Sequence, residues 1–235
     1  MDKQSITAVP LTLSTPLLAD ACIRLTVDVR LAPPGIRSVK PGTSLSGRAL
    51  PVRHYGSVDI FLEAFENCRP GDVLVIDNQG RVDEGCIGDL TVLEAKTAGV
   101  SGIVAWGCHR DTAEILEIGF PVFTYGTCSA GPLRLDERHA DALTSAGFGN
   151  HAITRDDFVF ADDDGVLFLP MDRLEQIVST ALLIQERERQ QAAMIKAGTS
   201  LRKQLRFSEY LSKRETDPSY SFRKHLRAIG GAIEE

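Results

Sequence analysis

The chain has 235 residues, and its 43% hydrophobic and 25% charged residues are typical of a globular protein with a sizeable core. A formal net charge of −6 and a pI near 5.4 predict neither a nucleic-acid nor a membrane partner. No apolar run is long enough to span a bilayer, and residues 1–13 lack the basic and apolar regions of a signal peptide.

The first half of the chain predicts alternating helices and strands, which is the pattern of an α/β fold. The β-branched run at 73–77 is typical of a strand covered on both faces. The predicted helices are residues 15–25, with Thr15 as N-cap, then 57–69, 88–99 and 111–118. The predicted strands are residues 44–53, 73–77, 101–106 and 120–125.

The second half predicts a hairpin and then a long helix. Residues 158–169 flank an Asp-Gly turn, which is a strong hairpin signal. The helix begins at Met171, is interrupted at Gly198 and resumes over residues 201–211. We expect one α/β domain over residues 1–212, followed by a polar tail over 213–235 that forms a surface extension or a partner-contacting arm.

The cysteine pattern favours a reducing compartment. The number of cysteines is odd, and no two have the CxxC spacing of a zinc or redox site. Because disulfide frameworks belong mainly to secreted proteins, we expect free thiols and a cytoplasmic location. The cysteines are Cys22, Cys68, Cys86, Cys108 and Cys128.

Polar residues concentrate in two segments, 85–91 (GCIGDLT) and 107–111 (GCHRD), and each follows a buried strand and opens a helix. Ligands of open α/β sheets bind at such strand ends, where helix N-termini present free N–H groups. Two readings of Arg110 and Asp111 stay open. Asp111 caps the helix beside a solvated Arg110, or Asp111 binds a hard cation while Arg110 binds a substrate carboxylate.

Asp89, followed after twenty residues by Arg110-Asp111, resembles the signature of 4-hydroxy-4-methyl-2-oxoglutarate aldolases and their ribonuclease-regulator-like (RraA-like) relatives. The resemblance extends over about residues 14–205 and includes four more blocks: 70–75 (PGDVLV), 99–104 (GVSGIV), 119–123 (GFPVF) and 162–166 (DDDGV). It implies a single domain of swivelling β/β/α type with a C-terminal helical extension, assembled as a homotrimer or hexamer.

The resemblance also implies a function, a divalent-metal-dependent lyase that cleaves 4-hydroxy-4-methyl-2-oxoglutarate or a similar 4-hydroxy-2-oxo acid to pyruvate. Oxaloacetate decarboxylation yields the same enolate and is expected as a second activity. Asp111 would bind the metal, Mg²⁺ or alternatively Mn²⁺, and Asp89 would orient a water or proton relay. The substrate-binding residues would be Gly88, Asp89, Leu90, Thr91 and Arg110.

The sequence departs from this family near its C-terminal end. Such aldolases use an additional acid from a neighbouring subunit, but the matching stretch 198–201 (GTSL) has none. Glu186, Glu188 and Glu209 are the candidate substitutes. A related lyase or decarboxylase on another oxo acid is therefore a further alternative.

The alternative from another class is a non-enzymatic regulator that binds a ribonuclease or another protein. Relatives with that role have lost the first acid, so Asp89 favours the enzyme. Three weaker motifs have plain structural explanations. We expect a helix C-cap at 147–152 (GFGNHA) rather than a dinucleotide site, a hairpin turn at 162–164 rather than a metal site, and no nucleophile–base pair at Cys108-His109.

Overall fold

A mixed eight-stranded sheet, in the order β1-β10-β9-β3-β4-β5-β6-β2, runs through the computed structural model, which describes residues 9–230. Its centre is parallel, as the alternation of strands and helices predicts. The parallel strands are β3 (Leu45–Arg53), β4 (Val73–Ile87), β5 (Gly102–His109) and β6 (Val122–Thr124). The helices that connect them are α2 (Asp59–Glu66), α3 (Asp89–Thr97) and α4 (Thr112–Ile118).

Antiparallel strands complete both edges of the sheet. The expected hairpin pairs β9 (Asp157–Asp162) with β10 (Gly165–Pro170), and β9 also pairs with β3. The two outermost strands are β1 (Arg30–Leu31) and β2 (Arg37–Ser38). A separate hairpin of β7 (Ser145–Phe148) and β8 (His151–Thr154) forms the second sheet.

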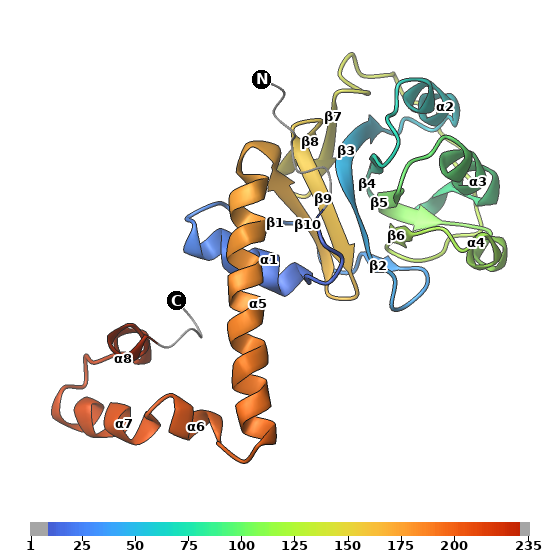
Figure 1. Cartoon of the computed structure of the whole chain (residues 1–235). Helices are drawn as coiled ribbons and strands as arrows, with labels where there is room; N and C mark the ends of the chain where they lie inside the picture. Colours follow the sequence, from blue (N-terminus) through green and yellow to red (C-terminus); the bar gives the residue numbers. More distant parts are fainter. Residues whose placement is uncertain (1–8, 231–235) are drawn as a thin grey trace, which may run out of the picture.

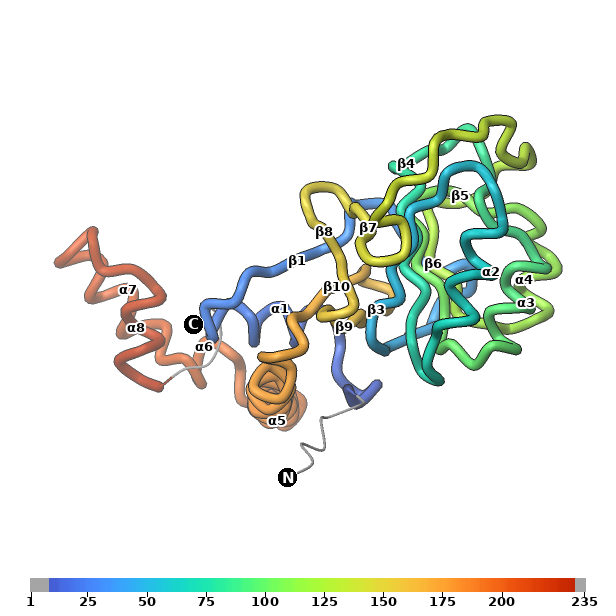
Figure 2. The backbone as a smooth tube through the Cα atoms, turned by 90° about the horizontal axis from the view of Figure 1, so that it is seen from above, coloured from blue at the N-terminus to red at the C-terminus, as the bar shows by residue number. Residues whose placement is uncertain are grey.

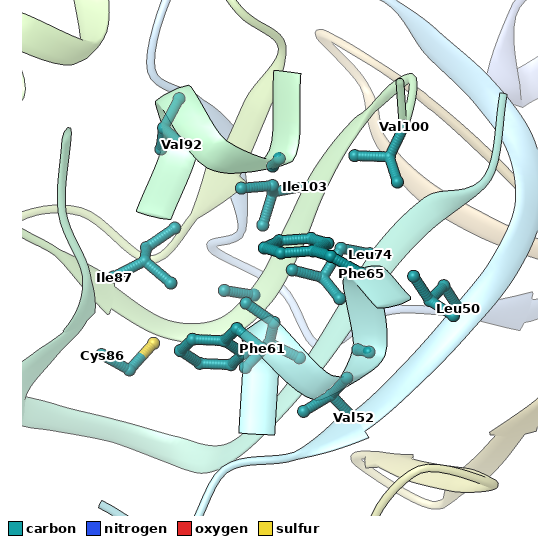
Figure 3. Close-up of a cluster of buried hydrophobic side chains, with 14 of the residues drawn as sticks. Leu50, Val52, Phe61, Phe65, Leu74, Cys86, Ile87, Val92, Val100 and Ile103 are labelled. Carbon is teal, nitrogen blue, oxygen red and sulfur yellow. The ribbon is translucent and has the colours of Figure 1, made fainter. Parts of the chain in front are cut away.

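Three layers result, and they explain why the central strands are apolar on both faces. Helices α2–α4 cover one face of the parallel strands, and Phe61 and Phe65 of α2 pack on Leu74 and Ile103 (Figure 3). On the opposite face, Phe148 of β7 belongs to the cluster that contains the inward side chains of β3 and β4. The predicted β/β/α arrangement is confirmed.

A second apolar cluster lies under the antiparallel half of the sheet. Helices α1 (Thr15–Arg24) and α5 (Leu174–Lys196) pack there on β9 and β10. Thr15 is not the N-cap of α1, because that position belongs to Ser14. Instead, the backbone N–H and the hydroxyl of Thr15 both donate to the Asp162 carboxylate, at 2.8 and 2.6 Å.

The described C-terminal part is mainly helical, including parts of the segment expected as a polar tail. A short 3₁₀ turn (Met171–Arg173) leads into α5, which carries the chain away from the sheet (Figures 1 and 2). The last helices are α6 (Leu201–Gln204), α7 (Phe207–Thr216) and α8 (Phe222–Ile229). The expected boundary at residue 213 therefore falls inside α7, and residues 231–235 lie outside the described part of the chain.

Two sequence-based expectations are corrected. Strand β4 does not end at Asp77 but continues through three register shifts to Ile87, where it pairs again with β5. The segment 147–152 is not a helix C-cap, because it contains the end of β7, the turn and the start of β8. Gly149 adopts a positive φ of 60° at that turn. Within residues 9–230, no helix has the length and apolar character needed to cross a membrane.

The layer formed by β7 and β8 gives a stability prediction. We expect Phe148→Ala to lower the free energy of unfolding by about 3–5 kcal/mol, because it empties a fully buried site. Urea unfolding would measure the loss. The matched control is Asn150→Ala at the exposed turn, which should change stability by less than about 0.5 kcal/mol. Equal losses in the two variants would contradict the layered core.

Candidate active site

The two polar segments singled out in the sequence lie side by side at the carboxyl ends of β4 and β5. Ile87 pairs with His109 in the parallel ladder, and the Arg110 backbone N–H donates to the Ile87 carbonyl at 3.0 Å. Gly88 then occupies the N-cap position of α3, while Asp111 occupies that of α4. The structure therefore brings together all the residues predicted for the site.

Asp111 has an unusual backbone conformation that aims its carboxylate at the neighbouring helix. Its φ of 61° and ψ of 46° are left-handed, a conformation that costs on the order of 1–3 kcal/mol in a non-glycine residue. Its side chain makes no capping bond to α4. Instead, Oδ2 accepts from the Asp89 backbone N–H at 3.4 Å. Asp111 therefore occupies the N-cap position of α4 without capping that helix through its side chain.

The close approach of the Asp111 carboxylate to the start of α3 requires a glycine at residue 88. A methyl group at residue 88 would overlap Oδ2 of Asp111 and would lie 3.3 Å from Nε of Arg110. The start of α3 thus presents its backbone to a carboxylate at close range. A helix N-terminus favours negative charge because its first N–H groups have no partner within the helix.

Arg110 lies beside this carboxylate and stays open to solvent. Its Nε is 3.4 Å from Asp111 Oδ2, and the two side chains are 49% and 36% exposed. An ion pair with this exposure adds little stability, so both groups are free to exchange their contact for a ligand. A guanidinium next to a carboxylate suits a small anion that also carries an oxygen for a cation.

Asp89, Leu90 and Thr91 form the first turn of α3. The Asp89 carboxylate accepts from the Leu90 backbone N–H at 2.8 Å, and the Leu90 side chain is 75% exposed. Thr91 is half-buried. Asp89 is thus held at the start of α3, within two residues of the Gly88–Asp111 contact.

His109 supports the site from behind. Its Nδ1 lies 2.7 Å from Oγ1 of Thr124, and its Nε2 lies 3.1 Å from Oγ1 of Thr112. Burial lowers the pKa of His109, so the ring is neutral at pH 7. Burial also raises the pKa of the Cys108 thiol, which removes the thiolate that a nucleophile needs. As expected, the pair is structural.

A buried polar network next to the site has no signal in the sequence. The Arg134 guanidinium donates to Glu84 at 3.0 Å and to Oδ1 of Asn78 at 2.8 Å. That same oxygen is 2.8 Å from Nδ1 of His54, whose pKa is lowered by burial. Nothing in the sequence relates these residues, because 50 positions separate Glu84 from Arg134.

This network fixes the chain segment that borders Arg110. The Gly85 backbone N–H donates to the Ala130 carbonyl at 2.7 Å, and a Cβ on Gly131 would lie 3.0 Å from Nη1 of Arg110. A polar cavity of about 550 Å³ opens on the other side of the network, between Arg53, His54 and residues 136–140. None of the predicted site residues lines that cavity.

Asp111 is not part of a cluster of potential metal ligands in the described part of the chain. Among residues 9–230, no three His, Cys, Asp or Glu side chains gather closely enough to hold an ion. Mg²⁺ commonly takes one or two carboxylates and completes its shell with water and substrate oxygens. A half-exposed carboxylate such as Asp111 fits such a water-rich site.

The other metal candidate, 162–164, is occupied by structural contacts. Asp162 binds Thr15, as described above, and its Oδ1 also accepts from the Asp164 backbone N–H at 3.0 Å. Asp163 accepts from the Gly42 backbone N–H at 2.9 Å. The hairpin-turn interpretation of this segment is confirmed.

The chain matches the family model described as Aldolase/RraA over residues 15–168. This match covers more than half of the chain and includes α3, α4 and both site segments. The protein therefore belongs to the Aldolase/RraA family, as its sequence resemblance implied.

Individual relatives agree with this assignment. Protein DlpA of Legionella pneumophila is 34% identical over 131 residues, which cover 55% of this chain but only 21% of DlpA. The "Putative 4-hydroxy-4-methyl-2-oxoglutarate aldolase" of Dechloromonas aromatica is 29% identical over 67% of this chain and 96% of its own length. Streptomyces coelicolor RraAS2, described as an unusual member of the RNase ES inhibitor RraA protein family, superposes with a TM-score of 0.69. That alignment has 26% identity and covers 80% of this chain and 96% of RraAS2.

The buried histidines predict a pH dependence of stability. Burial holds the pKa of His54 and His109 in the folded chain below the ordinary 6.5. As the pH falls toward and below 6.5, the unfolded chain therefore binds more protons than the folded chain. The free energy of unfolding should therefore decrease from about pH 7 to pH 5, and His109→Gln should reduce this slope.

Urea unfolding at a series of pH values measures the slope. His139→Gln is the control, because the His139 ring is exposed and its loss should leave the slope at the wild-type value. A wild-type slope in His109→Gln would mean that the buried ring is not the neutral group described here.

Proposed function

We propose that this protein is a divalent-metal-dependent carbon–carbon lyase that releases pyruvate from a 4-hydroxy-2-oxo acid. The observation that carries the proposal is the meeting of Arg110 and Asp111 with the first turn of α3 at one solvent-open point. Membership of the Aldolase/RraA family supports it. The substrate would be 4-hydroxy-4-methyl-2-oxoglutarate or a similar acid.

The chain's own groups account for binding of the substrate. The 2-oxo acid would place its carboxylate on the backbone of Gly88–Thr91 and near the Arg110 guanidinium. A fork of N–H donors on Arg110 matches a carboxylate or an enolate oxygen. Because the guanidinium is already held beside the helix N-terminus, little reorganisation is needed when negative charge develops.

Cleavage removes the proton of the 4-hydroxyl group and breaks the C3–C4 bond, and the pyruvate enolate then takes up a proton. Asp89, half-exposed at the start of α3, would orient the water that carries these protons. Asp111 would hold the ion, Mg²⁺ or Mn²⁺, which when bound supplies Lewis-acid polarisation of the 2-oxo group. Arg110 would stabilise the enolate charge.

Oxaloacetate decarboxylation fits the same arrangement, because loss of its distal carboxylate also leaves a pyruvate enolate. The identity of the natural oxo acid depends on groups beyond Arg110 and Asp111. Glu186 and Glu188 lie on the exposed part of α5, and Glu209 lies on α7. These helices do not form the site around Arg110 and Asp111, so such an acid would complete the site of a neighbouring subunit. Assembly as a homotrimer or hexamer is therefore part of this proposal.

A protein-binding regulator is the second candidate function, and the likeness to RraAS2 favours it. Asp89 favours the enzyme, because the family resemblance implies that regulators have lost this acid. All five cysteines are free thiols, which supports a cytoplasmic location in this proposal.

Removal of either charged group should slow the reaction strongly. We expect Arg110→Ala and Asp111→Ala each to lower kcat/KM for pyruvate release by about 10²–10³-fold, the usual cost of losing one preorganised charge contact. A coupled lactate dehydrogenase assay with Mg²⁺, with and without EDTA, measures this release. EDTA should suppress the wild-type reaction.

The neighbouring pair Asp172 and Arg173 provides the control. It lies in the 3₁₀ turn before α5, outside the site, so Asp172→Ala and Arg173→Ala should keep wild-type turnover. Wild-type turnover in Arg110→Ala or Asp111→Ala, or pyruvate release that EDTA does not affect, would refute the assignment. No pyruvate release from wild type would favour the regulator.

The close approach at Gly88 gives an independent prediction. Gly88→Ala forces the Asp111 carboxylate away from α3, so we expect kcat/KM to fall by about tenfold or more, as for a misplaced reacting group. The circular dichroism spectrum should stay that of wild type. Full activity in this variant would show that the Gly88–Asp111 contact does not form the site.

A further inference from the structure

The polar cavity of about 550 Å³ lies outside the Arg110 site, where β3 ends beside the middle of β4. Arg53 and Asp77 are paired there in the parallel register, and the His54 backbone N–H donates to the Asp77 carbonyl at 2.9 Å. The exposed segment 136–140 forms the opposite wall. Ligands of open α/β sheets bind at the carboxyl ends of strands, in pockets of roughly 300–1,000 Å³. The place and the size of this cavity therefore suit a small molecule.

His54 is a buried group with a nitrogen that opens on this cavity. Its side chain is only 2% exposed, and its ring stacks on Phe61 at 5.1 Å between centroids. Nδ1 lies 2.8 Å from Oδ1 of Asn78, whereas Nε2 makes no hydrogen bond within residues 9–230. Unlike Nδ2 of Asn78, Nε2 is not sealed off by protein atoms. Because His54 lines the cavity, Nε2 is left for a ligand.

The neighbours of His54 decide which ring nitrogen carries the hydrogen. Nη2 of Arg134 donates to Oδ1 of Asn78 at 2.8 Å, and because a guanidinium only donates, that acceptor is the amide oxygen. Nη2 also lies 3.5 Å from Nδ1, but the shorter contact of Nδ1 with the amide oxygen requires a hydrogen on Nδ1. Burial lowers the pKa of His54, so the ring is neutral at pH 7. Nε2 therefore presents a lone pair, which needs a donor from the ligand.

The cavity wall carries charges of both signs. Its arginines are Arg53 and Arg138, and its carboxylates are Asp77, Asp136 and Glu137. A simple anion would meet the carboxylates, and a simple cation would meet the guanidinium groups. Complementary charge therefore favours a ligand that carries both signs itself.

Both arginines can accept a carboxylate of the ligand. Arg53 donates from Nε to the Ser145 carbonyl at 3.2 Å, and its Nη2 lies 3.4 Å from the Asp141 carboxylate, but its Nη1 has no partner in the described part of the chain. Arg138 pairs with Glu63 at 2.7 Å, and these side chains are 41% and 46% exposed. An ion pair with this exposure adds little stability, so Arg138 can exchange it for a ligand.

The acidic groups and His54 together call for an ammonium. The Asp77 carboxylate is held in place by the backbone N–H groups of Gln79 and Gly147, at 2.9 and 2.8 Å. The Glu137 carboxylate has no partner within residues 9–230. An ammonium has three donors, enough for the lone pair of His54 and for a carboxylate, whereas a hydroxyl has one. No three potential metal ligands gather among the described residues, which favours an organic cation over a metal ion.

We propose that this cavity binds an α-amino acid. The ammonium donates to Nε2 of His54 and faces the carboxylates of Asp77 and Glu137. The ligand's carboxylate lies against Arg53 and Arg138. Binding at this cavity does not depend on the reaction performed at the other site.

Isothermal titration calorimetry of the full chain with each standard L-α-amino acid tests the proposal. At least one should bind at millimolar concentration or below. The one that binds best is then compared with its 2-hydroxy acid, which lacks the ammonium, and with its decarboxylated amine, which lacks the carboxylate. Each analogue should bind more weakly by about tenfold or more, because each loses a charge-assisted contact.

Two variants test the residues that hold the ligand. His54→Phe keeps a ring against Phe61 and removes both nitrogens, while Arg138→Ala removes an exposed guanidinium. Each should weaken binding of the amino acid by about tenfold or more and keep the wild-type circular dichroism spectrum. The matched controls, His151→Phe and Arg69→Ala, do not line the cavity and should bind like wild type.

Three results would overturn the proposal. The first is that no L-α-amino acid binds at millimolar concentration. The second is a 2-hydroxy acid that binds as tightly as the amino acid. The third is wild-type affinity in either cavity variant, including the case in which Arg110→Ala removes binding instead. Failure of pyruvate release leaves all of these outcomes unchanged, so it tests the lyase proposal alone.

Discussion

The site depends on one close contact, the Asp111 carboxylate against the backbone of Gly88. Strand β4 must first return beside β5, so that Ile87 pairs with His109 and the two helix starts become neighbours. The left-handed backbone of Asp111 then turns its carboxylate away from α4 and toward α3, at a cost of about 1–3 kcal/mol. Only glycine at residue 88 leaves room for it. Arg110 lies at the same point because it directly precedes Asp111 in the chain.

Exposed and buried groups have different roles at this site. Arg110 and Asp111 are half-exposed and remain available to a ligand. The groups behind them are buried or half-buried, and most of their polar atoms have partners, as the cost of an unpaired buried polar group requires; Nδ2 of Asn78 has none. His109 is held between two threonine hydroxyls, and Arg134 is held by Glu84 and Asn78. This support holds the solvent-open charges in place for a ligand.

Local sequence patterns predicted the elements and the neighbourhood of the site, because strand ends and helix starts are marked by nearby residues. They failed where distant residues decide. The turn-forming run 78–80 hid the continuation of β4, which depends on pairing with β5. The Arg134–Glu84 pair joins positions 50 residues apart and leaves no pattern. Helices α7 and α8 pack around a small aromatic core that includes Tyr210 and Phe222, which periodicity alone did not reveal.

We propose that Arg110, Asp111 and the start of α3 form one binding site for a 2-oxo acid. A crystal structure of the protein soaked with Mg²⁺ and pyruvate tests this most directly. We expect the ion on the Asp111 carboxylate and the pyruvate carboxylate between Arg110 and the 88–91 backbone. An ion or pyruvate bound elsewhere, with these two side chains turned away from the 88–91 turn, would contradict it.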